Sequence, residues 1–150
     1  MTGQLIARVL LAGLCGLQGL GTLAADLNHT HATNPEWPGH ARFHLVWQAS
    51  AFAWLALLEI VLIFGGGPFH EQRFYLAAIL AGLPMLGFFT AFIGRRIYRG
   101  TLSDPNGIPP ANLTIMNSQL RVDLSLVAET GVAFVLAAII ALYRHSSVAR

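Results

Sequence analysis

The sequence predicts an all-α integral membrane protein that folds as a bundle of four transmembrane helices. Hydrophobic residues make up 55% of the 150 residues, charged residues make up only 11%, and the mean hydropathy is +0.58. In a typical soluble domain about a quarter of all residues are charged, so this composition excludes a soluble enzyme. The basic residues form no stripe with interleaved aromatic side chains, and we therefore expect no nucleic-acid partner.

Four apolar runs are each long enough to cross a bilayer, because a hydrocarbon core of about 30 Å needs about 20 helical residues. The predicted spans are residues 5–25, 45–64, 74–94 and 122–143, which form a single domain over residues 1–150. An even number of spans places both termini and the short connection 65–73 on one face. The two long connections, 26–44 and 95–121, lie together on the other face, which we call the mouth of the bundle.

The first run can also be interpreted as a signal peptide, because Arg8 precedes an apolar stretch that ends in small residues before Asp26. We prefer a retained helix, since the run is longer than a typical signal core. In addition, Gly13, Gly16 and Gly19 form a small-residue ridge that suits helix packing.

Three of the helices contain residues that mark where they begin or bend. Pro38 suits a first helical turn, so the second helix should begin there and carry His40 and His44 on one face. Pro84 removes a backbone donor in the middle of the third span, which predicts a kink. Asp123 lies near the start of the fourth span, where it can cap the helix or pair with an arginine at the interface.

The arginines are divided almost evenly between the two faces, so the positive-inside rule leaves the orientation open. Arg95, Arg96 and Arg99 end the third helix, where cations complement the helix dipole and snorkel into headgroups. The alternative is that they hold an anionic headgroup or a carboxylate above the mouth.

The first connection holds the densest polar segment, with four of the six histidines. Histidines at i, i+4 can bind a transition metal, and an extended segment can complete such a site. The residues that would form it are His29, His31, His40 and His44. We prefer the interpretation that these rings lie at the membrane interface, where one side is apolar and the other wet. The sequence indicates no particular cofactor.

Polar residues continue from this segment into the second span. A rotation of about 100° per residue places His44, Gln48, Leu55 and Glu59 within about 60° of one another. We therefore expect a polar stripe that runs from the mouth into the interior of the bundle. The candidate ligand-binding residues are His40, Arg42, His44, Trp47, Gln48 and Asp123.

Glu59 and Glu129 are the candidate catalytic residues. A carboxylate at membrane depth costs about 2.5 to 3.5 kcal/mol on insertion scales, so it must pair, take up a proton or face water. A protonated Glu can donate a structural hydrogen bond to a neighbouring helix, or it can act as a general acid. We expect Glu59 to matter more, since Glu129 has Ser125 and Arg121 along its own stripe as structural partners.

A motif, Asn-Pro-x-Trp-x-x-His-Ala-Arg-Phe-His, lies at residues 34–44, after a glycine-rich first span and before three further spans. With this pattern the chain resembles the DoxX-like group of small four-helix bacterial membrane proteins, in particular uncharacterised members with the same motif. The resemblance implies a four-helix bundle in a bacterial inner membrane. Some members of the group look like accessory subunits of membrane oxidoreductases, but the resemblance transfers no catalytic residue.

Three functions remain open. The first is a non-catalytic accessory subunit or a binding bundle for a lipid or quinone-like molecule, with the histidine-rich segment closing over the ligand or docking a membrane-protein partner. The second is a membrane-embedded acid/base enzyme of the isomerase or cyclase class that acts on a hydrophobic substrate. The third is a metal or proton transport element along the polar stripe, although the second helix offers no further polar residue beyond Glu59.

Overall fold

The computed structural model describes residues 3–104, 106, 108–116 and 118–148. Its elements are α1 (Gly3–Asp26), α2 (Gly39–Phe64), α3 (His70–Gly94), β1 (Ala111–Ile115), β2 (Ser118–Val122) and α4 (Leu124–Val148). The prediction of an all-α four-helix protein is confirmed, and the two strands form one small antiparallel sheet.

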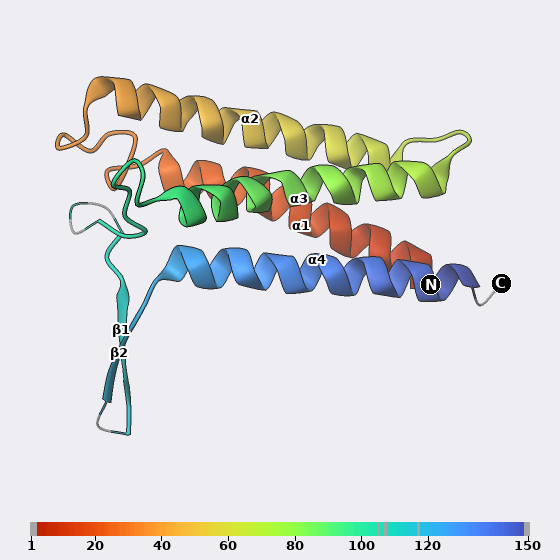
Figure 1. The fold of residues 1–150 in the computed structure, drawn as a ribbon. Helices are drawn as coiled ribbons and strands as arrows, with labels where there is room; N and C mark the ends of the chain where they lie inside the picture. Colours follow the sequence, from red (N-terminus) through yellow and green to blue (C-terminus); the bar gives the residue numbers. More distant parts are fainter. Residues whose placement is uncertain (1–2, 105, 107, 117, 149–150) are drawn as a thin grey trace.

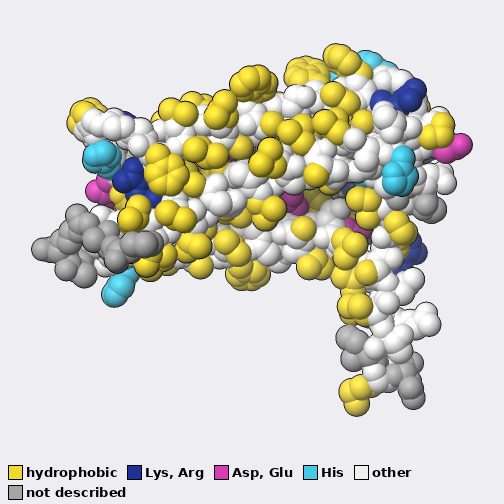
Figure 2. All heavy atoms as spheres, turned by 180° about the vertical axis from the view of Figure 1, so that it is seen from behind, with side chains coloured by type: hydrophobic (Ala, Val, Ile, Leu, Met, Phe, Trp, Pro, Cys, Tyr) yellow, Lys and Arg dark blue, Asp and Glu magenta, His cyan; other side chains and the backbone are white. Residues whose placement is uncertain are grey.

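All four helices are long and apolar enough to cross a membrane. They have 24 to 26 residues, which at about 1.5 Å per residue exceeds a hydrocarbon core of about 30 Å. Large apolar side chains such as Leu17, Trp54, Ile79 and Phe134 are exposed on their outer surfaces. Figure 2 shows such side chains along the whole length of the bundle. This is the architecture of a multi-pass integral membrane protein, in which lipid rather than water surrounds the helices.

The helices alternate in direction, and helices that follow one another in the chain lie side by side in the bundle. α1 packs mainly on α2 and α4, while α3 packs on α2 and α4. Both termini and the turn between α2 and α3 lie at one end, which we call the terminal end, and the two long connections lie at the mouth (Figure 1). The predicted arrangement of the connections is therefore confirmed.

The helix starts follow from local sequence. Pro38 occupies the N-cap position of α2, so the predicted start of this helix at Pro38 is confirmed. Pro84 lies inside α3, which remains helical from His70 to Gly94. The side chain of Asp123 caps α4, with Oδ1 accepting a hydrogen bond from the N–H of Leu126 at 3.1 Å. Capping is thus the contact that the structure gives Asp123, one of the two roles expected for it.

Only one of the three glycines in the expected ridge of α1 is packed against another helix. A Cβ at Gly19 would lie 2.7 Å from the Cβ of Ala56, so this glycine permits close approach of α1 and α2. Among the described residues, no heavy atom outside the local helix lies within 4 Å of a Cβ built at Gly13 or Gly16. The ridge prediction was wrong for these two, because steps of three residues turn by about 60° each and carry them off the contact face.

Arginine side chains close the terminal end of the bundle. The guanidinium of Arg8 donates to the carbonyl of Ile63, with Nε 2.9 Å from the oxygen, and lies 5.9 Å from the ring centroid of Phe64. Arg73 donates to carbonyl oxygens of the α2–α3 turn at 2.7 to 2.8 Å, namely those of Gly65, Gly66 and Pro68. The bonds to Ile63 and Gly65 satisfy carbonyls at the C-terminal end of α2, which have no partner within the helix, and those to Gly66 and Pro68 hold the turn that follows.

The second long connection contains a β-hairpin that the sequence analysis did not predict. β1 and β2 pair in the register Leu113↔Leu120, and Val122 pairs with Ala111. Val122, where the expected fourth span begins, lies in β2, and α4 begins at Leu124. The signal was the alternation of apolar and polar residues over 111–115 and 118–122, which has the period of a strand.

Candidate functional site

The motif segment before α2 folds around a buried asparagine. Asn34 is only 3% exposed, and its Nδ2 donates to the carbonyl of Thr30 at 3.3 Å and to that of Asn106. Its Oδ1 accepts a hydrogen bond from the N–H of Glu36 at 3.0 Å. Asn34 therefore joins the first long connection to the second, a role that sequence reasoning missed although the residue lies inside the quoted motif.

The histidines of this segment do not assemble into one site. The Nε2 atoms of His40 and His44 lie 3.0 Å apart on the exposed surface of α2. The ring of His31 instead lies edge-on to Trp37, 5.0 Å between centroids, and its Nδ1 is 2.7 Å from the hydroxyl of Thr30. Within the part of the chain that the structure describes, no three His, Cys, Asp or Glu side chains are placed to hold a metal ion. The four-histidine site considered from sequence, which also included His29, is therefore not formed.

The expected polar stripe on α2 does not enter the bundle. His44 and Gln48 are exposed, Leu55 is half-buried, and Glu59 is 2% exposed. The buried face of α2 is made by Ala49, Ala56, Glu59 and Ile63. Glu59 belongs to that face, whereas His44 and Gln48 lie beside it. The stripe covers about 60° around the helix axis, and this angle is enough to place its residues near the mouth on the outer surface.

Within the described residues, none of the candidate ligand-binding side chains lines either the groove between α1 and α4 or the small cavity at the mouth, which are described below. Most of them lie exposed on α2, where the ring of His44 stacks on that of Trp47 at 5.8 Å. Arg42 is half-buried, and Asp123 belongs to the start of α4. The set that the structure brings together on α2 is His40, His44 and Trp47 with Phe43.

Glu59 lies against a partner on α1 that sequence reasoning missed. The thiol of Cys15, which is fully buried, interacts with the Glu59 carboxyl. In the described chain, Oε1 of Glu59 is buried without a hydrogen-bond partner. One turn along α1, Gln18 donates from Nε2 to the carbonyl of Ala81 at 3.0 Å. The α1 helix therefore supplies polar contacts to both α2 and α3 inside the bundle.

Glu129 is half-buried, and its Oε2 is buried with no hydrogen-bond partner among the described residues. The stripe expected from Arg121 through Ser125 to Glu129 is wrong at Arg121, because that residue lies in β2, opposite Asn112, and not on α4. Ser125 lies one helical turn nearer the mouth than Glu129, on the same face of α4.

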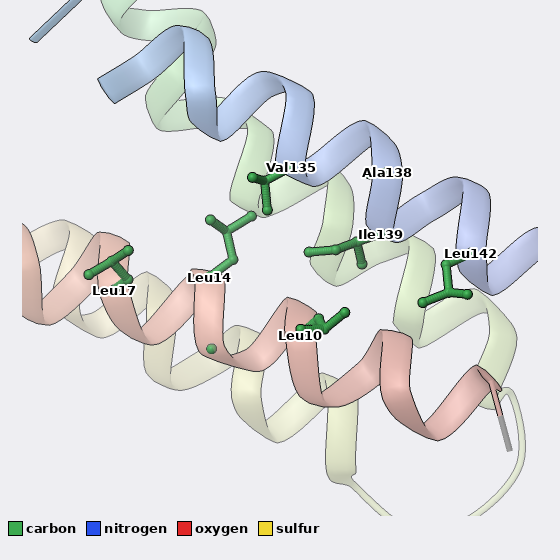
Figure 3. Close-up of a pocket in the computed structure, with 8 residues that line it drawn as sticks. Leu10, Leu14, Leu17, Val135, Ala138, Ile139 and Leu142 are labelled. Carbon is green, nitrogen blue, oxygen red and sulfur yellow. The ribbon is translucent and has the colours of Figure 1, made fainter. Parts of the chain in front are cut away.

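An apolar groove runs between α1 and α4 (Figure 3). Its volume is about 380 Å³, and side chains from the two helices point toward one another across it. The lining residues are all apolar: Leu10, Gly13, Leu14, Leu17, Val135, Ala138, Ile139 and Leu142. Leu10, Leu17 and Val135 are about half or more exposed on the outer surface, so the groove opens toward the surrounding bilayer.

A smaller cavity of about 170 Å³ lies at the mouth, between the end of α3, the segment after it and the start of α4. Arg95 lines it, with its guanidinium 4.1 Å from the ring centroid of Phe92 and Nη1 donating to the carbonyl of Phe92 at 2.6 Å. The other lining residues are Phe88, Ala91, Tyr98, Thr101, Leu102 and Ser125. One cation and several hydroxyl groups suit an anionic or carbonyl group of a ligand.

No family model, curated protein or solved structure matches this chain. The chemistry of the candidate site therefore follows from its geometry. The structure offers an apolar groove open to lipid, a small polar cavity at the mouth, and two interior carboxyl groups that each have an oxygen without a partner among the described residues.

Proposed function

We propose that this protein is a non-catalytic membrane bundle that binds a lipid or quinone-like molecule by its hydrocarbon chain. The observation that carries the proposal is the groove between α1 and α4. Its volume of about 380 Å³ lies within the range of about 300 to 1,000 Å³ typical of ligand sites. Because the lining is aliphatic throughout, the groove recognises an acyl or isoprenoid chain and leaves the polar headgroup outside.

Gly13 makes the groove possible. It lines the groove, and a side chain added there would meet open space in the described structure, so a larger residue would occupy the volume that a ligand needs. Gly16 lies on the same helix, also faces open space, and lies outside the lining of the groove. The two glycines therefore provide a test variant and a matched control.

The experiment is native mass spectrometry of the protein extracted in mild detergent, comparing wild type with Gly13→Leu and Gly16→Leu. We expect wild type and Gly16→Leu to carry a lipid or quinone, and Gly13→Leu to lose most of it. Equal retention by both variants would refute the groove as the binding site. The same spectra report any stoichiometric membrane-protein partner.

An accessory role is part of the same proposal. It rests on the resemblance to DoxX-like proteins of the bacterial inner membrane, some of which look like accessory subunits, and a four-helix bundle is compatible with a place beside a larger membrane enzyme. Phe43, Trp47 and Trp54 expose large aromatic surfaces along α2, which such a partner or the lipid interface would cover.

A second candidate function is acid/base catalysis on a hydrophobic substrate. The observation that favours it is the buried Oε2 of Glu129, without a partner in the described chain and one turn below Ser125 of the mouth cavity. In this case Glu129 would donate the proton while Arg95 held a polar group of the substrate. Glu129→Gln should then abolish turnover while leaving ligand retention and melting temperature unchanged.

A further inference from the structure

The β-hairpin projects from the mouth of the bundle, sideways past α4 and across the direction of the helices (Figure 1). Strands of five residues span about 17 Å, which is more than the diameter of about 10 Å of a helix. β2 ends at Val122 and α4 begins at Leu124, so a single residue separates the hairpin from this helix. The hairpin therefore leaves the bundle at the mouth end of α4 and extends sideways beyond that helix.

The two faces of the hairpin differ in polarity. The cross-strand pairs Ala111↔Val122 and Leu113↔Leu120 share one face, because side chains alternate along each strand. The pairs Asn112↔Arg121 and Thr114↔Gln119 share the other face. We call these the leucine face and the polar face.

The leucine face is not buried by the bundle. Leu113 is 47% and Leu120 is 52% exposed, and Met116 at the tip is 95% exposed. Figure 2 shows hydrophobic side chains of the hairpin on the side that faces along the bundle, with other side chains on the opposite side. The leucine face is thus directed toward the level of the membrane, and the polar face is directed away from it.

We propose that the hairpin lies on the lipid leaflet, with the leucine face against the acyl chains and the polar face in water. Leu124 and Val127 are exposed at the start of α4, which follows β2 directly in the chain, so lipid that surrounds this end of α4 also lies beside the hairpin. Arg121 on the polar face lies at headgroup level, where its cation meets lipid phosphates.

The backbone of the hairpin limits how deeply the hairpin can enter the membrane. A two-stranded sheet has outer edges whose N–H and C=O groups need water or headgroups as partners, so it cannot enter the hydrocarbon core. An isolated hairpin is also only marginally stable in water. Burial of the leucine face in the interfacial region meets both conditions, because it removes apolar surface from water while the edges stay hydrated.

The experiment uses spin labels on neighbouring residues of opposite faces. Single cysteines replace Leu113 and Leu120 on the leucine face, and Thr114 and Gln119 on the polar face. Cys15 is the sole native cysteine and is fully buried, so labelling of the wild type measures the background. The full-length protein is reconstituted into vesicles of phosphatidylcholine with phosphatidylglycerol, and accessibility to oxygen and to a water-soluble nickel chelate is measured by power saturation.

We expect the oxygen-to-nickel accessibility ratio to be several-fold higher at residues 113 and 120 than at 114 and 119. If the labels at all four positions were equally accessible to the nickel chelate, both faces of the hairpin would be in water, and the proposal would be overturned. Low accessibility of 113 and 120 to both reagents would show protein on this face, such as a second copy of the chain, and would also overturn it. The helical circular dichroism of each variant verifies that the bundle remains folded.

Discussion

At the scale of single residues, Glu59 shows how far a sequence argument reaches. Its burial was predictable, because an acid in a long apolar run must find a partner inside the bundle. Its partner was not, since the contact with Cys15 depends on how α1 and α2 are rotated against each other. The stripe that favoured Glu59 over Glu129 does not enter the bundle, because His44 and Gln48 are exposed, so Glu129, below the mouth cavity, is the better candidate proton donor.

Replacement of Glu59 by Gln should leave stability within about 1 kcal/mol of wild type, because an amide keeps both the shape and an acceptor oxygen for the Cys15 thiol. Glu59→Ala should cost about 2 to 4 kcal/mol, because it leaves a cavity among the helices. Melting temperature in detergent measures both. A large loss of stability with Gln would contradict this prediction, because it would show that the folded bundle needs the carboxyl group itself.

Gly19→Ala should destabilise the bundle by about 1 to 3 kcal/mol, because the added Cβ would lie 2.7 Å from that of Ala56. The matched control is Gly16→Ala, which meets open space and should gain up to about 1 kcal/mol from helix propensity. Reversible unfolding in mixed micelles gives both free energies. Equal effects of the two substitutions would mean that α1 and α2 are not in close contact at Gly19.

At the scale of elements, the helices were readable from sequence and the hairpin was overlooked. Length of the apolar runs and Pro38 predict where helices lie, since these are local properties of the chain. The strands also have a local signal, the alternation around Leu113 and Leu120, but it is short and stands in a segment rich in Asn, Pro and Gly. The groove between α1 and α4 has no local signal, because it arises from the packing of helices far apart in the sequence.

Asn34→Ala should loosen the mouth, because it removes the side-chain bonds to the carbonyls of Thr30 and Asn106 at a cost of about 1 to 3 kcal/mol. Limited proteolysis should then cut the connection between α3 and β1 faster than in wild type. Asn112→Ala, on the exposed polar face of β1, serves as the control and should leave the cleavage rate unchanged. Unchanged cleavage in Asn34→Ala would show that the two connections are held together by other contacts.

At the scale of the whole molecule, the four spans predict that both ends of the chain and the α2–α3 turn lie on one side of the membrane. Single cysteines at the exposed residues Glu36 and Asn112 mark the mouth, and those at Gly66 and Val148 mark the terminal end. A membrane-impermeant maleimide should label one pair from each side of intact cells or spheroplasts. Labelling of Glu36 and Asn112 from opposite sides would exclude the four-span topology.

The arginine contacts at the terminal end have a consequence for motion. Arg8 and Arg73 hold backbone carbonyls there, and the rings of Phe74 and Tyr143 stack at 3.7 Å, so that end behaves as a fixed base. At the mouth, the side-chain bond that links the two long connections within the described residues is the one from Asn34 to the carbonyl of Asn106. Thermal fluctuations should therefore grow in amplitude toward the mouth, and backbone amides of one helix should exchange with deuterium progressively faster from its terminal half to its mouth half.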